Sequence, residues 1–150
     1  MQVRHQARII AVQALYEIDI ANHDADTVLA QRFEETDLPE SGIEFARQLV
    51  HGVLEYRPQA DSIIQRIAPD WPVDQLAVID RNILRLAIYE LVVANETPVK
   101  VVINEAVELA KLFGSDSTRR FVNGALGTLV REKDKFQIKP RAGDSPPDTR

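Results

Sequence analysis

The sequence predicts an all-α protein of about seven helices in two docked helical subdomains, and three observations support this. Apolar residues recur at spacings of three and four along most of the 150 residues, the period of a helix with one buried face. No segment alternates apolar and polar residues for long enough to predict a strand. Short segments rich in Pro, Gly or Asn separate the periodic stretches. We expect one domain over 1–133, with subdomains at about 1–57 and 58–133, and a flexible, disordered tail over 134–150.

The first subdomain is predicted to hold three helices, at 3–20, about 26–35 and about 42–56. Gly52 lies inside the third helix, where glycine costs about 1 kcal/mol relative to alanine, so we expect a close helix crossing there. The first helix has a regular apolar face, but Ile9, Val12 and Tyr16 fall on its other side. Either the second subdomain covers these side chains, or they form a contact surface, as in a homodimer.

The second subdomain is predicted to contain a short helix at about 59–67 and a long central helix at about 74–94. Between residues 76 and 94, 14 of 19 residues are apolar or Tyr, so this helix is expected to be buried on nearly all sides. Asp80, Arg81 and Arg85 are unusual in so apolar a helix. Because buried charges are costly unless paired, these residues are expected to pair with each other or to contact a partner.

Residues 97–130 are predicted to form two further helices joined by a short hinge. Thr97 and Pro98 suit the start of the first, and Gly114 is expected to end it in the left-handed conformation. Ser115 or Asp116 can cap the start of the second helix. The polar corner, defined as Ser115 to Arg120, lies between the two apolar stretches.

Composition indicates an ordinary soluble protein, expected in the cytoplasm. No stretch approaches the roughly 18 apolar residues of a membrane helix, no signal peptide is evident, and cysteine is absent. The net charge of −5 argues against indiscriminate coating of nucleic acid. The charge is uneven, because 17–44 holds nine acids and one arginine, whereas 111–135 holds six bases and three acids. Such asymmetry can orient a polyanion, although solvated helix faces also explain it.

No catalytic or metal-binding pattern is found, so the sequence predicts neither an enzyme nor a bound cofactor or metal. His5, His23 and His51 lack the neighbours of a zinc site, and no glycine-rich phosphate loop is present. Glu105 and Glu108 lie one helical turn apart, but without a nearby His they are expected to be solvated or salt-bridged.

Two surfaces combine basic and aromatic residues, as proteins that bind single-stranded RNA do. One is the first helix, with Arg4, His5, Arg8 and Tyr16. The other is the polar corner, where Arg119, Arg120 and Phe121 lie at a helix start whose free N–H groups favour phosphate. The spacing of Phe121 places it in the apolar stripe, which favours a core position over a stacking one.

Three segments closely resemble the NusB family of transcription antitermination proteins: ARIIAVQALYEID, DRNILRLAIYEL and PVKVVINEAVELAKLFGSDSTRRFVNGAL. The likeness spans about residues 3–130 in the same order. It implies an all-helical protein of two docked halves without enzymatic activity. It also implies pairing with ribosomal protein NusE, and binding of the pair to boxA RNA. That binding loads an antitermination complex on RNA polymerase, chiefly in ribosomal RNA operons.

The resemblance also implies site residues, although the first helix here carries a sparser basic run than is typical of the family. A partner surface for NusE is implied at Asp80, Arg81 and Arg85. Two alternatives stay open: a homodimeric interaction module of the same fold, or a detached accessory domain of a ribosomal RNA methyltransferase. The implied RNA-binding residues are Arg4, His5, Arg8, Gln13, Tyr16, Ser117, Arg119, Arg120, Phe121 and Asn123.

Overall fold

The computed structural model describes residues 2–136, which form seven α-helices and no strand. The predicted all-α class is therefore confirmed, and each predicted helix has a counterpart. The helices are α1 (Gln2–Ala21), α2 (Ala25–Glu34), α3 (Glu40–Glu55), α4 (Arg57–Ile67), α5 (Val78–Ile88), α6 (Val99–Phe113) and α7 (Asp116–Arg131).

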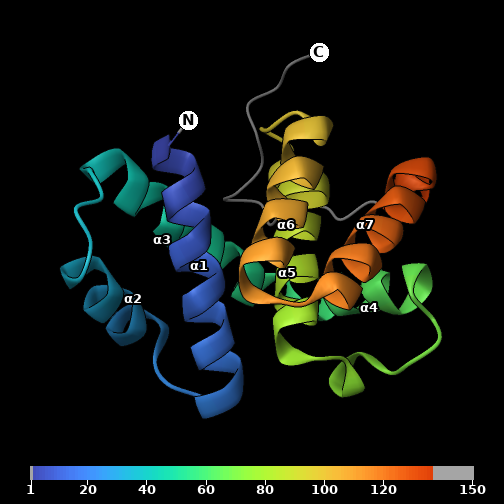
Figure 1. Ribbon diagram of the computed structural model, residues 1–150, viewed down its shortest axis with the longest axis horizontal. Helices are drawn as coiled ribbons and strands as arrows, with labels where there is room; N and C mark the ends of the chain where they lie inside the picture. Colours follow the sequence, from blue (N-terminus) through green and yellow to red (C-terminus); the bar gives the residue numbers. More distant parts are fainter. Residues whose placement is uncertain (1, 137–150) are drawn as a thin grey trace.

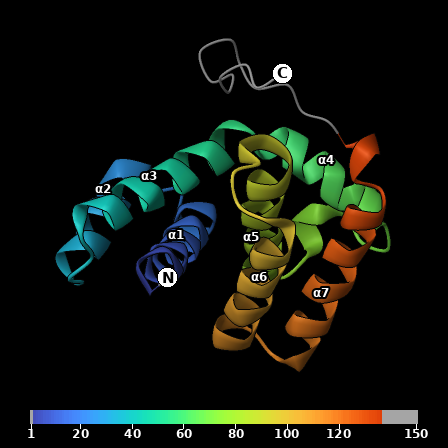
Figure 2. The same ribbon diagram turned by 90° about the horizontal axis from the view of Figure 1, so that it is seen from above.

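The helices form two groups, α1–α3 and α4–α7, which Figure 1 shows side by side. Seen from above in Figure 2, α1, α6 and α7 lie on one side of the molecule, and α3 and α4 lie on the other. α5 lies between them and contacts α1, α4, α6 and α7. Only Tyr56 separates α3 from α4, and both groups contribute to one core, so the division into two subdomains stays a prediction.

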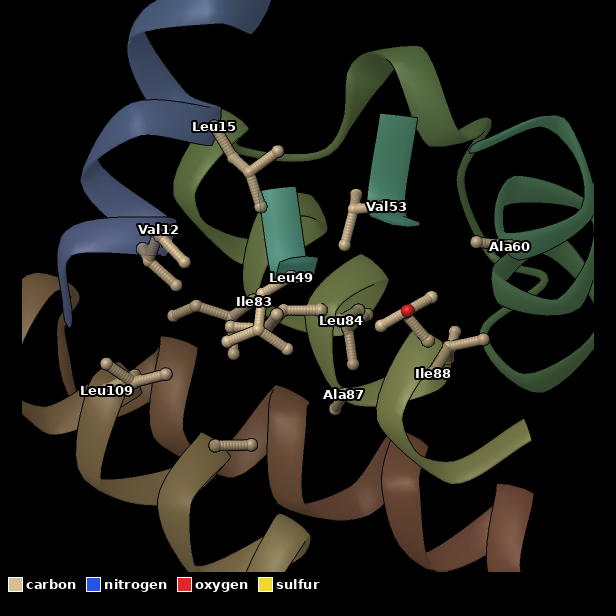
Figure 3. Close-up of a cluster of buried hydrophobic side chains, with 14 of the residues drawn as sticks. Val12, Leu15, Leu49, Val53, Ala60, Ile83, Leu84, Ala87, Ile88 and Leu109 are labelled. Carbon is tan, nitrogen blue, oxygen red and sulfur yellow. The ribbon is translucent and has the colours of Figure 1, made fainter. Parts of the chain in front are cut away.

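The centre of the core is α5, as its composition predicts. Its side chains from Asn82 to Ile88 are all buried. Figure 3 shows the α5 residues surrounded by side chains from α1, α3 and α6. The labelled members of this cluster are Val12, Leu15, Leu49, Val53, Ala60, Ile83, Leu84, Ala87, Ile88 and Leu109.

The central segment is not one continuous α-helix, and this part of the prediction is wrong. A 3-10 turn at Val73–Gln75 comes first, and extended backbone at Leu76 and Ala77 separates it from α5. After α5 the chain widens into a π turn, Tyr89–Ala94. Asn95 ends this turn with a φ of 52°, and its N–H donates to the Glu90 carbonyl at 2.9 Å. Apolar residues continue through all of these segments, so periodicity did not reveal the breaks.

The predicted close crossing at Gly52 is present. A Cβ atom there would overlap the ring of Tyr89, so α3 and the π turn approach closely only because residue 52 has no side chain. Gly114, by contrast, is extended rather than left-handed, with φ −118° and ψ −157°. It leads into Ser115, whose hydroxyl caps α7 by accepting a hydrogen bond from the Thr118 N–H at 3.4 Å.

The described chain continues past the predicted start of the tail at residue 134. A 3-10 turn, Lys133–Lys135, leads to Phe136, which is only 5% exposed. The Arg66 guanidinium of α4 lies 5.1 Å from the centre of the Phe136 ring. This aromatic side chain thus packs on the core, and the boundary of the tail stays a prediction. The rest of the predicted tail, 137–150, lies outside the described residues.

Candidate functional site

The first helix presents its basic residues unequally. Arg8 is only 3% exposed, and Glu90 of the π turn holds its guanidinium with both carboxylate oxygens, each at 2.8 Å. Burial disfavours the charge of Arg8, but the hydrogen bonds and charge of Glu90, with the charge of Glu105, outweigh burial and raise the pKa of Arg8. Arg8 is therefore a permanently charged internal link between α1 and the π turn.

Arg4 and His5 lie nearer the surface than Arg8. The Arg4 side chain is exposed and stacks on the Phe45 ring, with the guanidinium carbon 4.0 Å from the ring centre. His5 is half-buried, and its Nδ1 lies 2.9 Å from Oε1 of Glu105 on α6. The predicted basic group of α1 thus divides into an exposed stacked arginine, a half-buried histidine and a buried arginine.

Further along α1, the side chains that face outward are Gln13, Tyr16 and Ile20. Tyr16 is 41% exposed and Ile20 is 56% exposed, while Gln13 is half-buried. Val12 was one of the residues of the suggested apolar contact surface, but it is completely buried, in a cluster that also holds side chains of α5 and α6 (Figure 3). The other half of the molecule therefore covers Val12, as the first of our two explanations requires.

The polar corner carries exposed side chains around one buried anchor. Thr118 is buried, while Ser117, Arg120 and Asn123 are exposed and Arg119 is half-buried. Within residues 2–136, neither Arg119 nor Arg120 forms an ion pair with an acidic side chain. Both guanidinium groups are therefore available to an external anion.

Phe121 follows directly after these arginines. Its side chain is half-buried and packs against the core, in agreement with its place in the apolar stripe.

Arg81 and Arg85 are paired within the molecule, with acids of α1 and α4 rather than with Asp80, and their contact with a partner stays a prediction. Arg85 makes two hydrogen bonds with Asp61 of α4, at 2.7 and 2.9 Å, and a third with Asp19 of α1 at 3.0 Å. Arg81 donates to both carboxylate oxygens of Asp19, at 2.8 and 3.0 Å, and the Asn82 side-chain amide donates to Asp19 at 2.9 Å.

Asp19 is therefore the centre of a polar network that joins α1 to α5. Its side chain is 5% exposed. Burial opposes ionisation of this carboxyl, but hydrogen bonds from Arg81 and Asn82 and the charges of Arg85 and Arg81 prevail and lower its pKa to about 2.

Asp80 occupies a different environment from its neighbour Arg81. Its Oδ1 is buried and has no hydrogen-bond partner among the described residues. Burial raises the pKa of this carboxyl, and a hydrogen bond from the Thr118 hydroxyl offsets the rise only in part. The start of α5 thus lies against the first turn of α7, within the polar corner.

The helices that carry the two predicted nucleic-acid surfaces lie on the same side of the molecule. Figure 2 shows that α1, α6 and α7 share the side opposite α3 and α4. The contacts between residues agree, because Asp19 of α1 accepts hydrogen bonds from Arg81 and Asn82 of α5, and α5 packs against α7.

The pairing residues Asp19, Asp61 and Glu90 were not predicted to take part in the site, although Glu90 gave a signal as a single carboxylate in the most apolar part of the chain. Glu105 was expected to be solvated or salt-bridged, and it lies near His5 and Arg8, at 2.9 and 3.9 Å. Residues 2–136 contain no group of His, Cys, Asp and Glu side chains able to hold a metal ion. No helix in this part of the chain is both long and apolar enough to cross a membrane.

A family model described as the NusB family matches residues 5–131. The chain belongs to the NusB family. NusB proteins of two bacteria illustrate the similarity. The transcription antitermination protein NusB of Roseiflexus castenholzii is 49% identical over 138 residues, covering 89% of this chain and 97% of the relative. The NusB protein of Dehalococcoides mccartyi strain CBDB1 is 48% identical over 128 residues, covering 85% and 90%.

Solved structures support the same assignment. NusB of T. maritima superposes with a TM-score of 0.79 at 34% identity, covering 90% of this chain and 97% of that chain. A chain in the crystal structure of antitermination factors NusB and NusE in complex with dsRNA gives a TM-score of 0.81 at 27% identity, covering 88% and 98%. That relative of NusB fold was thus crystallised with both a protein partner and RNA.

Proposed function

We propose that this protein is a transcription antitermination factor that binds boxA-type RNA together with ribosomal protein NusE. One observation carries the RNA-binding part: α1, which carries the exposed Tyr16, and α7, which carries Arg119 and Arg120 in its first turns, lie on the same side of the molecule, and within residues 2–136 no acidic side chain pairs with either arginine (Figure 2). Guanidinium groups suit phosphates and an exposed phenol ring suits a base, which is how single-stranded RNA is commonly bound.

The proposed direct contacts are the side chains that solvent reaches. Arg8 is proposed as a support that fixes α1, since its guanidinium is enclosed by Glu90, and Phe121 supports the start of α7. The half-buried Asp80 and Arg81 are proposed to form part of the NusE surface, with buried Arg85 beneath them. The proposed RNA contacts are Arg4, His5, Gln13, Tyr16, Ser117, Arg119, Arg120 and Asn123.

In this proposal the protein is an adaptor without catalytic activity, acting with RNA polymerase in the cytoplasm on ribosomal RNA operons. The relatives are named as antitermination proteins, and no cofactor is needed for binding of this kind.

The decisive experiment measures affinity for a boxA-like single strand with and without NusE, at two salt concentrations. We expect NusE to strengthen binding and higher salt to weaken it, because each phosphate contact releases counterions. Changing Arg120 to Ala should weaken binding and reduce the salt slope by about 0.7, the value for one phosphate on a single strand. Arg47→Ala is the matched control, because Arg47 lies on α3 and is paired with Glu44 at 3.3 Å.

Equal affinity for a scrambled strand, with no gain from NusE, would refute the proposal.

A homodimer is the second candidate, favoured by exposed Tyr16 and Ile20 on adjacent turns of α1. Light scattering separates the two, because a dimer through this surface should be lost in Ile20→Asp and should compete with RNA.

A further inference from the structure

The feature that the proposed function does not use is Asp19, the buried carboxylate near the end of α1. It accepts hydrogen bonds from three neighbouring side chains of α5, Arg81, Asn82 and Arg85, at 2.8 to 3.0 Å. A fourth donor, Arg57 of α4, lies at 3.4 Å. A single acid thus ties the last turn of α1 to two other helices.

Both surfaces proposed to bind RNA are attached to this network. Tyr16 lies one helical turn before Asp19 on α1. On the other side, Asp80 directly precedes Arg81 and lies next to Thr118, the buried anchor of the polar corner, where α5 packs against α7. Contacts therefore run from α1 through the start of α5 to the start of α7.

We propose that Asp19 is a positioning residue for RNA binding: it holds Tyr16 at a fixed separation from Arg119 and Arg120, so that one RNA strand contacts both surfaces. The inference rests on the proposed function. Its physical basis is that a strand bound at one surface meets the second at high effective concentration only if the two are held in the right geometry. Without Asp19 the two surfaces would still exist, but they would act more independently.

The rest of α1 is held by other contacts, so loss of Asp19 should not unfold the protein. Arg8 and Glu90 anchor its first half, and the buried side chains of Leu15 and Ile18 anchor the second. Arg85 would keep its two hydrogen bonds to Asp61. These contacts make Asp19→Asn, which preserves side-chain volume, a usable variant.

The test compares two RNAs on the full-length chain with NusE. One is a boxA-like strand long enough to span both surfaces, and the other is a short fragment that fills only one. We expect Asp19→Asn to weaken the affinity for the long strand about tenfold, because it removes part of the gain that linked sites provide. The affinity for the short fragment should stay unchanged. Asp19→Glu, which keeps the charge, should recover part of the loss.

Asp26→Asn is the matched control, since it removes the same charge from the exposed surface of α2, where Asp26 is 72% exposed. Asn82→Ala is a second variant, which removes one hydrogen bond of Asp19 and should show a smaller loss with the same selectivity. Equal losses for both RNAs, or no loss for either, would overturn the inference while leaving the proposed function intact. Failure of the unaltered protein to bind the long strand would instead refute the proposed function.

Discussion

Glu90 encloses the guanidinium of Arg8 with both of its carboxylate oxygens, across 82 residues of sequence. The pair fixes the first half of α1 to the π turn that follows the central helix. Glu105 of α6 lies 3.9 Å from the same guanidinium and 2.9 Å from His5, so the pair also adjoins a third helix. An arginine that composition alone assigns to RNA thus takes part in holding the fold together.

Glu90→Gln should lower the free energy of unfolding by about 3–5 kcal/mol, because it leaves the buried charge of Arg8 without its counter-charge. Urea unfolding followed by circular dichroism measures this loss. Changing both residues, as Arg8→Met with Glu90→Met, should cost clearly less than the sum of the single changes. As a control, Glu44→Gln, which breaks the exposed ion pair between Glu44 and Arg47, should lower the free energy of unfolding by less than about 1 kcal/mol. A loss that small for Glu90→Gln would contradict a buried pair.

Acid should destabilise the protein through Asp19. Its pKa is lowered from 3.8 to about 2 in the folded chain, so its stabilising effect is complete above about pH 4 and is lost as the pH falls toward 2. The shift corresponds to about 2 kcal/mol. The unaltered protein should therefore lose stability as the pH falls from about 4 to 2, and the difference in free energy of unfolding between it and Asp19→Asn should shrink. Parallel pH profiles for the two proteins would rule out this account.

Asp80 should have the opposite effect. Burial raises its pKa, and Oδ1 has no hydrogen-bond partner within residues 2–136, so the ionised carboxylate destabilises the folded state at neutral pH. Asp80→Asn should raise the free energy of unfolding by on the order of 1 kcal/mol at pH 7. The gain should shrink as the pH falls through the folded pKa of Asp80 and the unaltered side chain takes up a proton. Asp74→Asn, at an exposed position nearby, is the control. A lower free energy of unfolding in Asp80→Asn would contradict a destabilising carboxylate at this position.

Two helix glycines should respond in opposite directions to alanine. At Gly124 of α7 a Cβ meets nothing within 4 Å, so Gly124→Ala should stabilise the helix by up to about 1 kcal/mol. At Gly52 the Cβ would overlap the Tyr89 ring, so Gly52→Ala should destabilise by about 1–3 kcal/mol. Thermal unfolding compares the two, and a stabilising Gly52→Ala would show that the crossing is looser than described.

The helices were predictable because each has an apolar face, and helical period locates such faces without knowledge of the partner helix. The π turn was not, since a shift from α to π hydrogen bonding at Tyr89–Ala94 leaves the apolar content unchanged. The exposed residues of the polar corner could be named from sequence, because the cap and helix start are local. The acidic partners of Arg8 and Arg85 could not, because they lie 82 and 24 residues away in the sequence.

The π turn also lets this part of the chain absorb a change in its own length. A π turn holds one residue more than regular α-helical hydrogen bonding would accommodate. Deleting Val92 or Val93 would therefore return the segment to α-helical bonding with little rotation of the chain that follows. The same deletion inside α5 would rotate the residues after it by roughly 100° about the helix axis and turn Glu90 away from Arg8. A relative that is one residue shorter here should keep its acidic partner for the first helix only if the missing residue comes from the π turn.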